Sequence, residues 1–541
     1  MKRKGIVASV LLSCGLAAAW VWTARAAPPP DPPDWRLQRT FEAMIAMRDG
    51  VRLSTLVKLP SEGEGPWPAI VQRTPYDKNR GAGAGDAHTK RGYAYVIQDV
   101  RGLFASEGEY RAFENDQADG YDTVEWIAAQ PWSDGKVGAT GGSAGGITAT
   151  QAVMSRPPHL TCAYVTVSHG SSYRYANYSG GVFFQAMVEG WMKGRGVEPS
   201  PDPRPLMGRY GEAERKLDIR TYADQIEIPM YNVGGWFDIF SQGNIDAFTL
   251  LEHNGKQKLV MGPFGHGQLG GDLRFPDRGE DRRAGDQSRF FDYWLKGVDD
   301  GFSKEPAVHY YVMGDGMNGG KGPGNEWCTA DSWPPPSEPT RYYLQAEGGL
   351  APAKPVEAGA DVYVYDPRDP VPTIGGPNLN IAKGPMDQRP TRNRSDVLRY
   401  QTAPLAEPVE VVGQVKAELW VSTDAEDTDF IVKLVDVYPN GYEAVLLDQP
   451  LRLRYREGID RWAKVKPGET YPIEVDLWST AQVFAPGHRI QVQVTSSDAP
   501  RFERHTNTWL PLASYDQAVK ARNTVYWSKA KPSAIVLPVA P

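Results

Sequence analysis

The feature that most constrains the fold of this chain is a serine among glycines, in the segment Gly141-Gly142-Ser143-Ala144-Gly145. It directly follows a strand-like run at residues 136–140. A serine flanked by glycines at the end of a strand is typical of a nucleophile elbow, where the backbone turns so sharply into a helix that only small residues fit. The alternative is a flexible glycine-rich loop, since the chain holds 56 glycines. The context of the motif decides between the two.

Length and composition indicate a globular protein with more than one domain. A chain of 541 residues is too long for one compact core, so two or three domains are expected. Its 41% hydrophobic and 23% charged residues are typical of globular proteins. With a formal net charge of −7, the composition gives no indication of nucleic-acid binding, which depends on a basic surface.

The first 26 residues have the pattern of a signal peptide. Basic residues at positions 2–4 precede an apolar run over residues 5–22, and Ala24-Arg25-Ala26 places small residues where a signal peptidase cleaves. We expect cleavage after this segment, or one residue later, and a protein that is secreted or periplasmic. Two alternatives remain open: an uncleaved membrane anchor, and lipidation at Cys14, where the sequence loosely resembles a lipobox.

Cleavage changes the charge of the chain without suggesting a macromolecular partner. Residues 1–26 hold four basic residues and no acidic one, so the mature chain carries a net charge of −11 rather than −7. This charge favours solubility, and neither a nucleic acid nor, after cleavage, a membrane is expected as a partner. Two cysteines remain, Cys162 and Cys328, and an exported chain of this length does not need a disulfide to fold.

Beyond a proline-rich lead-in at residues 27–40, the chain divides into two parts. Residues 41–315 alternate short apolar runs with helix-like segments, which predicts an α/β domain whose mainly parallel sheet is covered on both faces. Residues from about 170 to 222 break this rhythm and are interpreted as a short inserted cap. Residues 316–541 show short alternating runs separated by turn residues, which predicts an all-β domain of sandwich or jelly-roll type.

An acid and a base follow the serine in the order that serine nucleophiles require. The hydroxyl needs a base within hydrogen-bond reach, and the base needs an acid that fixes its tautomer. In the α/β-hydrolase fold, the acid and then the base lie in loops after later strands. With Ser143 after the fifth strand, the seventh strand leads to Asp238 and the eighth to His266. His169 precedes the acid in the chain, which is the wrong order for the base. The pattern therefore predicts an α/β-hydrolase fold in which Ser143, Asp238 and His266 form the catalytic set.

Two groups are candidates for stabilising an oxyanion. One is the backbone N–H of Ala144, directly after the nucleophile. The other is the phenol of Tyr76, in the segment Arg73-Thr74-Pro75-Tyr76 after the predicted third strand. Structural roles remain the alternatives: a surface aromatic in a proline turn for Tyr76, a helix-capping carboxylate for Asp238, and a loop histidine for His266.

Further motifs surround these residues. The N-terminal part holds Arg73-Thr74-Pro75-Tyr76, Asp99-Val100-Arg101-Gly102, residues 106–108, 119–123 and 130–138, Gly235-Trp236-Phe237-Asp238 and Gly262-Pro263-Phe264-Gly265-His266. Together with residues 427–451 of the C-terminal part, these blocks resemble the serine hydrolase family of cocaine esterases, α-amino-acid ester hydrolases and X-prolyl dipeptidyl-peptidases. The similarity covers nearly the whole mature chain. It implies an α/β-hydrolase domain followed by a C-terminal jelly-roll domain.

The resemblance also implies a role for each site residue. Ser143 is the expected nucleophile, His266 the base and Asp238 the acid that orients it. Tyr76 and the backbone N–H of Ala144 are the expected oxyanion donors. The matching reaction acylates the serine, releases an alcohol or amine, and ends with hydrolysis by water.

The sequence departs from this family near the site. Ala144 stands where the family often has tyrosine, which keeps the backbone donor but changes the pocket wall. Residues 239–241, directly after the acid, are apolar or neutral, whereas relatives that act on α-amino acyl groups have carboxylates near the site. Glu189, Glu198 and Asp202 in the cap are candidates for contacting a substrate amine, with solvated surface carboxylates as the simpler interpretation.

The sequence therefore predicts an exported serine hydrolase whose partner is a small-molecule ester or amide. The alternatives are an X-Pro-type dipeptidyl-peptidase or α-amino-acyl ester hydrolase or acylase and, from another class, a non-catalytic protein whose jelly-roll binds carbohydrate or a cell surface. The sequence shows no metal-binding motif, so neither a metal nor another cofactor is expected. The resemblance leaves a homo-oligomer open.

Overall fold

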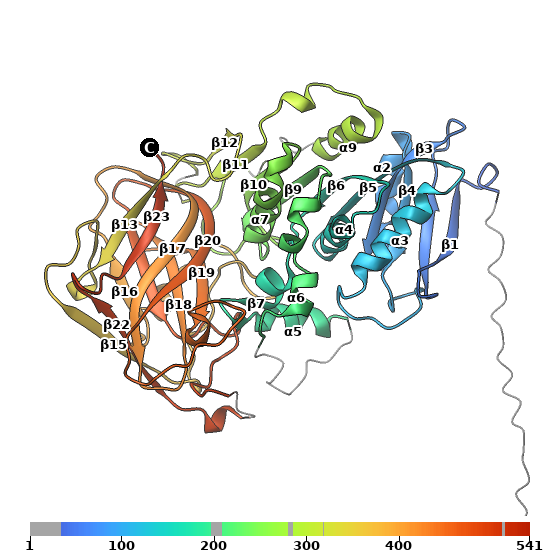
Figure 1. Ribbon diagram of the computed structural model, residues 1–541. Helices are drawn as coiled ribbons and strands as arrows, with labels where there is room; N and C mark the ends of the chain where they lie inside the picture. Colours follow the sequence, from blue (N-terminus) through green and yellow to red (C-terminus); the bar gives the residue numbers. More distant parts are fainter. Residues whose placement is uncertain (1–33, 196–207, 278, 280–284, 318, 511–513) are drawn as a thin grey trace, which may run out of the picture.

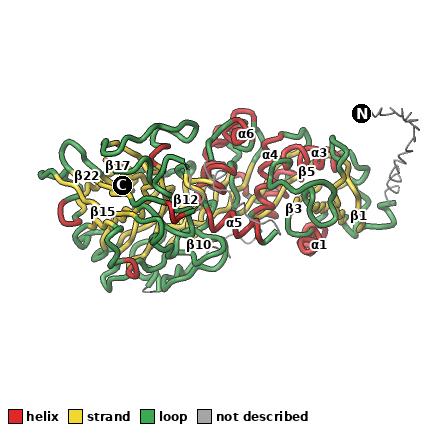
Figure 2. Tube along the Cα trace, turned by 90° about the horizontal axis from the view of Figure 1, so that it is seen from below, coloured by secondary structure: helices red, strands yellow, loops and turns green. Residues whose placement is uncertain are grey.

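The computed structural model describes residues 34–195, 208–277, 279, 285–317, 319–510 and 514–541 (Figure 1). The predicted signal peptide and the cap residues Glu198 and Asp202 lie outside these ranges. Within the described ranges, no helix is both long and apolar enough to span a bilayer. An α/β half and a β-rich half lie side by side along the long axis of the molecule (Figure 1, Figure 2).

The α/β half is built on one ten-stranded sheet with the strand order β1-β2-β4-β3-β5-β6-β9-β10-β11-β12. Neighbouring strands from β4 to β11 pair in parallel, while β1, β2 and β12 run antiparallel to their neighbours. The predicted mainly parallel sheet is therefore confirmed. The strands are β1 (Thr40–Ala46), β2 (Arg52–Lys58), β3 (Trp67–Thr74), β4 (Ala94–Asp99), β5 (Ser133–Gly142), β6 (Leu160–Thr166), β9 (Met230–Phe237), β10 (Lys258–Gly265), β11 (Val308–Val312) and β12 (Glu326–Ala330).

The central strands are buried on both faces, which explains their nearly continuous apolar runs. All residues of β4 and β9 are buried. Along β3, Ile70 packs into the core on one face of the sheet and Val71 into the core on the other, as the alternation of a strand requires. Gly138 in β5 leaves room for the ring of Phe291, since a Cβ at this glycine would lie 2.8 Å from that ring.

Helices cover both faces of the sheet, as predicted. α3, α4 and α7 pack on one face through residues such as Val124, Val153 and Leu251, and α9 packs on the other through Phe290. The last of these helices ends at Gly297, which adopts a left-handed φ of 72° as a helix C-cap commonly does. The helices of this half outside the cap are α1 (Lys78–Gly81), α2 (Gly85–Lys90), α3 (Asp116–Ala128), α4 (Ala144–Ser155), α7 (Ser241–Leu251) and α9 (Asp286–Lys296), with short turns η1 (Ala82–Ala84), η6 (Glu252–Asn254) and η7 (Phe302–Lys304).

The cap leaves the sheet after β6 and returns to it at β9. It contains a hairpin that no strand signal in the sequence indicated. Gly180 and Gly181 form its turn with positive φ, and a Cβ on Gly180 would lie 2.0 Å from the carbonyl oxygen of Pro450, so the cap packs tightly against the β-rich half. Its elements are η2 (Tyr173–Asn177), β7 (Tyr178–Ser179), β8 (Val182–Phe183), α5 (Gln185–Lys193), α6 (Glu212–Lys216), η4 (Ile219–Thr221) and η5 (Ala223–Gln225).

The β-rich half consists of two sheets around a shared core. The larger sheet has the order β14-β13-β23-β17-β22-β15, with β20 also paired to β17, and the smaller has the order β16-β21-β18-β19. Val415 and Val475 from the larger sheet and Leu434 and Val492 from the smaller one belong to one buried cluster. Its elements are β13 (Glu338–Leu344), η8 (Ala346–Gly348), β14 (Leu350–Ala351), β15 (Gly359–Tyr365), η9 (Arg389–Thr391), β16 (Leu398–Gln401), β17 (Val409–Thr423), β18 (Asp429–Val437), β19 (Glu443–Arg452), η10 (Leu453–Tyr455), β20 (Tyr471–Phe484), β21 (Arg489–Thr495), η11 (Tyr515–Gln517), β22 (Ala521–Trp527) and β23 (Ala534–Val539).

The last strand of the α/β sheet lies beyond the domain boundary that the sequence placed at residue 316. β12 pairs with β11 from Val308 opposite Ala330 to Val312 opposite Glu326, so this sheet extends to Ala330. Between these two strands, Met313 exchanges backbone hydrogen bonds with Ala481 and Val483 of β20. The two halves are thus joined by backbone bonds as well as by side chains.

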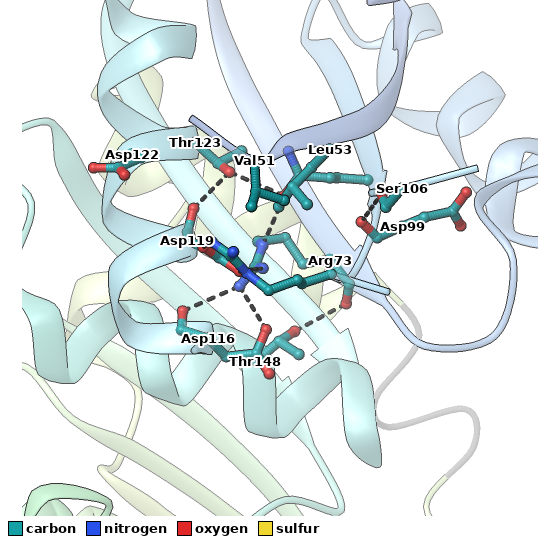
Figure 3. A network of polar contacts seen from close by, with 12 residues as sticks. Val51, Leu53, Arg73, Asp99, Ser106, Asp116, Asp119, Asp122, Thr123 and Thr148 are labelled. Carbon is teal, nitrogen blue, oxygen red and sulfur yellow. Dashed lines mark hydrogen bonds and ion pairs between the residues drawn. The ribbon is translucent and has the colours of Figure 1, made fainter. Parts of the chain in front are cut away.

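A buried guanidinium holds the end of β3 against its surroundings (Figure 3). Arg73 is 4% exposed. Its Nη1 lies 2.8 Å from Oδ1 of Asp116 in α3, and its Nε donates to Oε1 of Gln98 in β4 at 2.8 Å. The hydroxyl of Thr148 in α4 donates to the backbone carbonyl of Arg73 at 2.9 Å. One residue therefore ties together a strand end, a neighbouring strand and two helices.

A second arginine balances the buried charges next to this guanidinium. Asp119 is 1% exposed, and its carboxylate accepts from Nε and Nη2 of Arg101 at 3.0 and 2.6 Å. Nη2 of Arg73 lies 3.7 Å from the same carboxylate. Charges buried away from water are stable only when they are paired and hydrogen-bonded, as these are.

Replacing Arg73 should strongly destabilise the protein. The change Arg73→Met leaves the Asp116 carboxylate buried without its partner, and we expect the free energy of unfolding to fall by about 3 kcal/mol. Urea denaturation followed by tryptophan fluorescence measures this loss. The matched control is Arg341→Met, which breaks the more exposed pair of Arg341 with Glu418 and should cost less than about 1 kcal/mol. Equal losses in the two variants would contradict this account.

Candidate active site

Ser143 lies at a sharp turn between β5 and α4. The strand ends at Gly142 and the helix begins at Ala144, so the serine alone connects them. Its backbone has φ 54° and ψ −126°, a conformation that residues with a side chain rarely adopt and that functional sites retain. This is the geometry of the predicted nucleophile elbow, in which the side chain projects from the tip of the turn.

The two ends of the glycine motif have different steric requirements. A Cβ on Gly141 would lie 2.2 Å from the carbonyl oxygen of Gly145, a distance at which the turn has to open. A Cβ on Gly145 itself would meet its nearest neighbour, the carbonyl oxygen of Arg73, at 3.5 Å, which is ordinary van der Waals contact. The turn at Ser143 therefore requires glycine at position 141 but not at position 145.

The structure brings Ser143, His266 and Asp238 together in one hydrogen-bonded chain. Nε2 of His266 lies 2.8 Å from Oγ of Ser143, and Nδ1 of His266 lies 2.7 Å from Oδ2 of Asp238. The three residues follow β5, β10 and β9, whose carboxyl ends meet at one edge of the sheet because these strands are parallel. The positions predicted from strand order are therefore adjacent in the fold.

The carboxylate sets the tautomer of the imidazole. Asp238 is fully buried, and its second oxygen accepts from the backbone N–H of Phe240 at 2.8 Å. Because the ionised carboxylate only accepts hydrogen bonds, Nδ1 of His266 carries the proton that it donates to Asp238. Nε2 then has a free lone pair facing the hydroxyl of Ser143, which is what removal of the serine proton requires.

The backbone N–H of Ala144 lies at the N-terminus of α4. Ala144 is the first residue of this helix and is 2% exposed. The first N–H groups of a helix have no carbonyl partner within the helix, and the positive end of its dipole lies at the same place. The group is thus suited to donate to a developing oxyanion next to Ser143.

Tyr76 is held from the cap rather than by the serine. Its hydroxyl accepts from Nε1 of Trp191 in α5 at 3.3 Å, and the guanidinium of Arg195 lies 4.3 Å from the centre of its ring. The structure gives no hydrogen bond between the described residues Tyr76 and Ser143. Since an indole only donates, the phenol keeps its own proton available for another acceptor.

A large cavity opens in front of Ser143 and Ala144. Its volume is about 800 Å³, and Trp191, which holds Tyr76, forms part of its wall. Other apolar side chains from the loop before α3, from the cap, from α4 and from the segment after β9 line it, among them Phe113, Ile147, Val188, Ile239 and Phe240. A cavity of this size and lining is typical of sites for small organic molecules.

Three glutamates line the same cavity, and they are not the three that the sequence singled out. Glu114 precedes α3, and Glu212 and Glu214 belong to α6. Of the three acids predicted in the cap, Glu189 accepts a hydrogen bond from the side-chain amide of Gln185, which lies one turn earlier in α5. A pair of acids two residues apart within the predicted cap was the signal available in the sequence.

His169 is buried beside the site but does not join the hydrogen-bonded chain. Both of its ring nitrogens are buried without a hydrogen-bond partner, and its ring packs edge-on against Phe240 at 4.6 Å. Burial lowers the pKa of His169 to about 3, so its imidazole is neutral. The order of residues along the chain excluded His169 as the base, and its position outside the hydrogen-bonded chain agrees with that prediction. Among the described residues, no cluster of histidine, cysteine and acidic side chains is suited to hold a metal ion.

The sequence and the fold both match known proteins along nearly the whole chain. The model for the X-Pro dipeptidyl-peptidase (S15 family) matches residues 49–209 and 205–268, and that for the X-Pro dipeptidyl-peptidase C-terminal non-catalytic domain matches residues 300–536. Cocaine esterase of Rhodococcus sp. (strain MB1 Bresler) is 34% identical over 92% of this chain and 97% of its own. The chain belongs to the cocaine esterase and S15 peptidase family of serine hydrolases.

Solved structures support the same assignment. An aminopeptidase from a marine sediment Thaumarchaeota archaeon superposes with a TM-score of 0.79 at 27% identity, over 95% of this chain and 99% of its own. An α-amino acid ester hydrolase superposes with a TM-score of 0.78 at 26% identity, over 93% and 96% of the two chains. The protein is thus a hydrolase of the class that acts on ester or peptide bonds, with an α/β-hydrolase domain and a C-terminal β-rich domain.

The two glycines of the elbow should respond differently to the same substitution. Gly141→Ala forces the turn open, and we expect kcat for p-nitrophenyl acetate to fall roughly 100-fold or more, because a displaced nucleophile no longer meets its base. Gly145→Ala places its Cβ in ordinary contact and should change kcat less than about threefold. Comparable activity of the two variants, with both folded by circular dichroism, would contradict the steric account.

Proposed function

We propose that this protein hydrolyses carboxylic esters of small molecules through an acyl intermediate on Ser143. The hydrogen-bonded chain from Ser143 through His266 to Asp238 carries the proposal, because it ends on a strained elbow that faces a large apolar cavity. A buried carboxylate, an oriented imidazole and a hydroxyl that lines the cavity form the set that nucleophilic acyl transfer requires.

The proposed reaction proceeds in two halves. In the first, Nε2 of His266 takes the proton of Ser143 while Oγ attacks the substrate carbonyl carbon, and Asp238 stabilises the imidazolium that forms. The same imidazolium then gives the proton to the leaving alkoxide as the carbon–oxygen bond breaks. In the second half, water repeats this sequence: His266 accepts its proton, the hydroxide attacks the acyl carbon, and the proton returns to Oγ of Ser143 as the acid is released.

The two expected oxyanion donors support the same transition state. The N–H of Ala144 donates from the N-terminus of α4, where the helix dipole favours negative charge. Tyr76 donates its phenolic O–H, and the indole of Trp191 leaves that proton free by donating to the phenolic oxygen. The expected apolar acyl group occupies the cavity beside Ile147 and Val188.

A second candidate activity is hydrolysis of esters or amides whose acyl group carries an amine. The observation that favours it is the presence of Glu114, Glu212 and Glu214 in the cavity wall, since carboxylates hold an ammonium group by charge-assisted hydrogen bonds. Lys216 lines the same cavity and partly offsets this negative charge. The alternative prediction of an X-Pro dipeptidyl-peptidase belongs to this candidate, because a dipeptidyl substrate also presents an amine.

We also propose that the protein acts outside the cytoplasm, in the periplasm or as a secreted enzyme. The pattern of residues 1–26 supports this location. The two-sheet core of the β-rich half supports a jelly-roll arrangement for that domain. A small-molecule ester or amide remains the expected partner.

Removing the nucleophile tests the proposed activity. Ser143→Ala should reduce kcat for p-nitrophenyl esters by about 10⁴-fold or more, because the change removes the oxygen that forms the acyl intermediate. Release of p-nitrophenol at 405 nm measures this. Ser155→Ala, at the far end of α4, serves as the folded control with unchanged kcat. Substantial turnover by Ser143→Ala would refute the assignment.

A substrate panel separates the two candidate activities. We expect phenyl and p-nitrophenyl esters of acetic, butyric and benzoic acids to be cleaved, and kcat/KM to rise with the apolar surface of the acyl group. Matched esters with and without an α-amine test the second candidate. The second candidate would be favoured if the α-amine raised kcat/KM about tenfold or more and if Glu212→Gln or Glu214→Gln abolished this gain.

Removing one phenol tests the role of Tyr76. Tyr76→Phe should lower kcat for p-nitrophenyl acetate by about 100-fold with little change in KM, because the lost donor acts mainly on the transition state. The matched control is Tyr110→Phe, since the hydroxyl of Tyr110 is buried nearby without a hydrogen-bond partner. Similar kcat values for Tyr76→Phe and the unmodified protein would exclude the phenol as a donor.

A further inference from the structure

We propose that Lys383, which belongs to the C-terminal β-rich domain, is a positioning residue for His266 and is needed for full turnover. This inference rests on the proposed function, because it assigns His266 as the base. It gives an active-site role to a domain whose family description calls it non-catalytic.

Two contacts fasten the loop of His266 to the β-rich half. Nζ of Lys383 donates to the backbone carbonyl of His266 at 3.0 Å. The backbone N–H of Gly270, four residues later, donates to the carbonyl of Lys383 at 2.8 Å. The histidine loop is thus held at both ends by a single residue of the other domain.

The histidine loop needs such a fastening. His266 lies between Gly265 and Gly267, and the latter has a φ of 115° that residues with a side chain rarely adopt. The N–H of Gly267 donates to the carbonyl of Gly265 at 2.7 Å, so the loop turns tightly at the histidine. Glycines lose more conformational freedom on ordering than other residues, and the bonds of the imidazole to Ser143 and Asp238 do not restrain the backbone.

The segment that carries Lys383 is itself well anchored. Gly376 and Gly384 exchange backbone hydrogen bonds, both of 2.9 Å, which close the loop between them. Asn378 is 4% exposed, and its amide donates to the carbonyls of Gly375 and Ala382 at 2.6 and 2.8 Å. The ammonium therefore projects from a rigid support toward the histidine loop.

The ammonium also joins the base to the cavity wall. Nζ of Lys383 donates to the carbonyl of Leu379 at 2.7 Å, and Leu379 lines the cavity in front of Ser143. Burial lowers the pKa of Lys383, and the nearby Asp238 carboxylate opposes this shift. A charged donor makes stronger hydrogen bonds to carbonyl groups than a neutral one does, so this half-buried contact fixes the distance between the base and the wall.

Removing the ammonium should slow the chemical step more than it weakens binding. For Lys383→Met, we expect kcat for p-nitrophenyl acetate to fall roughly tenfold while KM stays within about twofold, because a displaced base acts mainly on the transition state. Lys383→Arg keeps a charged donor and should recover most of kcat. The matched control is Lys256→Met, because Nζ of Lys256 donates to the carbonyl of Glu227 far from the site.

The pH profile gives a readout that a structural role alone would not move. The ionisable groups that face His266 are Ser143 from the elbow, Asp238 after β9 and Lys383 from the β-rich half. The ammonium of Lys383 is a nearby cation, which disfavours the protonated form of the His266 imidazole. Lys383→Met should therefore move the acid limb of the kcat/KM profile to higher pH by about half a unit. Lys383→Arg keeps the positive charge and should leave the acid limb unchanged. If Lys383→Met does not fold, Lys383→Gln provides the same test.

An unchanged kcat and an unchanged acid limb in folded Lys383→Met would overturn this inference. The proposed function would stand in that case, provided that Ser143→Ala is inactive. If Ser143→Ala retains activity, the proposed function fails first and the role of Lys383 fails with it.

Discussion

Gly141 and Gly145 come so close at the end of β5 that the carbonyl of the second occupies the space a side chain on the first would need. The sharp turn at Ser143 is possible because position 141 has no side chain, and this turn starts α4 at the next residue. It therefore sets both the direction of the hydroxyl and the position of the Ala144 N–H. The acid and the base reach the same point because their strands run parallel to β5 and end at the same edge of the sheet.

The surroundings hold this turn in place from two sides. From the α/β half, the guanidinium of buried Arg73 connects the strand that precedes Tyr76 to α3, and the backbone carbonyl of the same residue accepts from Thr148 of α4. From the β-rich half, Lys383 holds the loop of His266. A serine site of this kind needs its groups fixed to within a fraction of an ångström, and here two domains supply the support.

The sequence is sufficient to predict the elements that follow a regular pattern. Strand order alone placed Asp238 and His266, and the glycines identified the turn at Ser143. Contacts between distant segments leave no such pattern: Lys383 lies 117 residues from His266 in the chain, and no periodicity links them. Glu212 and Glu214 were missed because the cap has no sheet to order its residues. The pairing of β12 with β11 left no pattern either, because β12 is a short edge strand of mixed composition, EWCTA.

The most direct test of the central claim is mass spectrometry of the protein after reaction with a fluorophosphonate. Such a reagent forms a stable bond only with a hydroxyl that a neighbouring base activates. We expect a single adduct, mapped by peptide analysis to Ser143, and very slow labelling of His266→Ala. An unlabelled protein, or an adduct on a different residue, would contradict the assignment of Ser143 as the nucleophile.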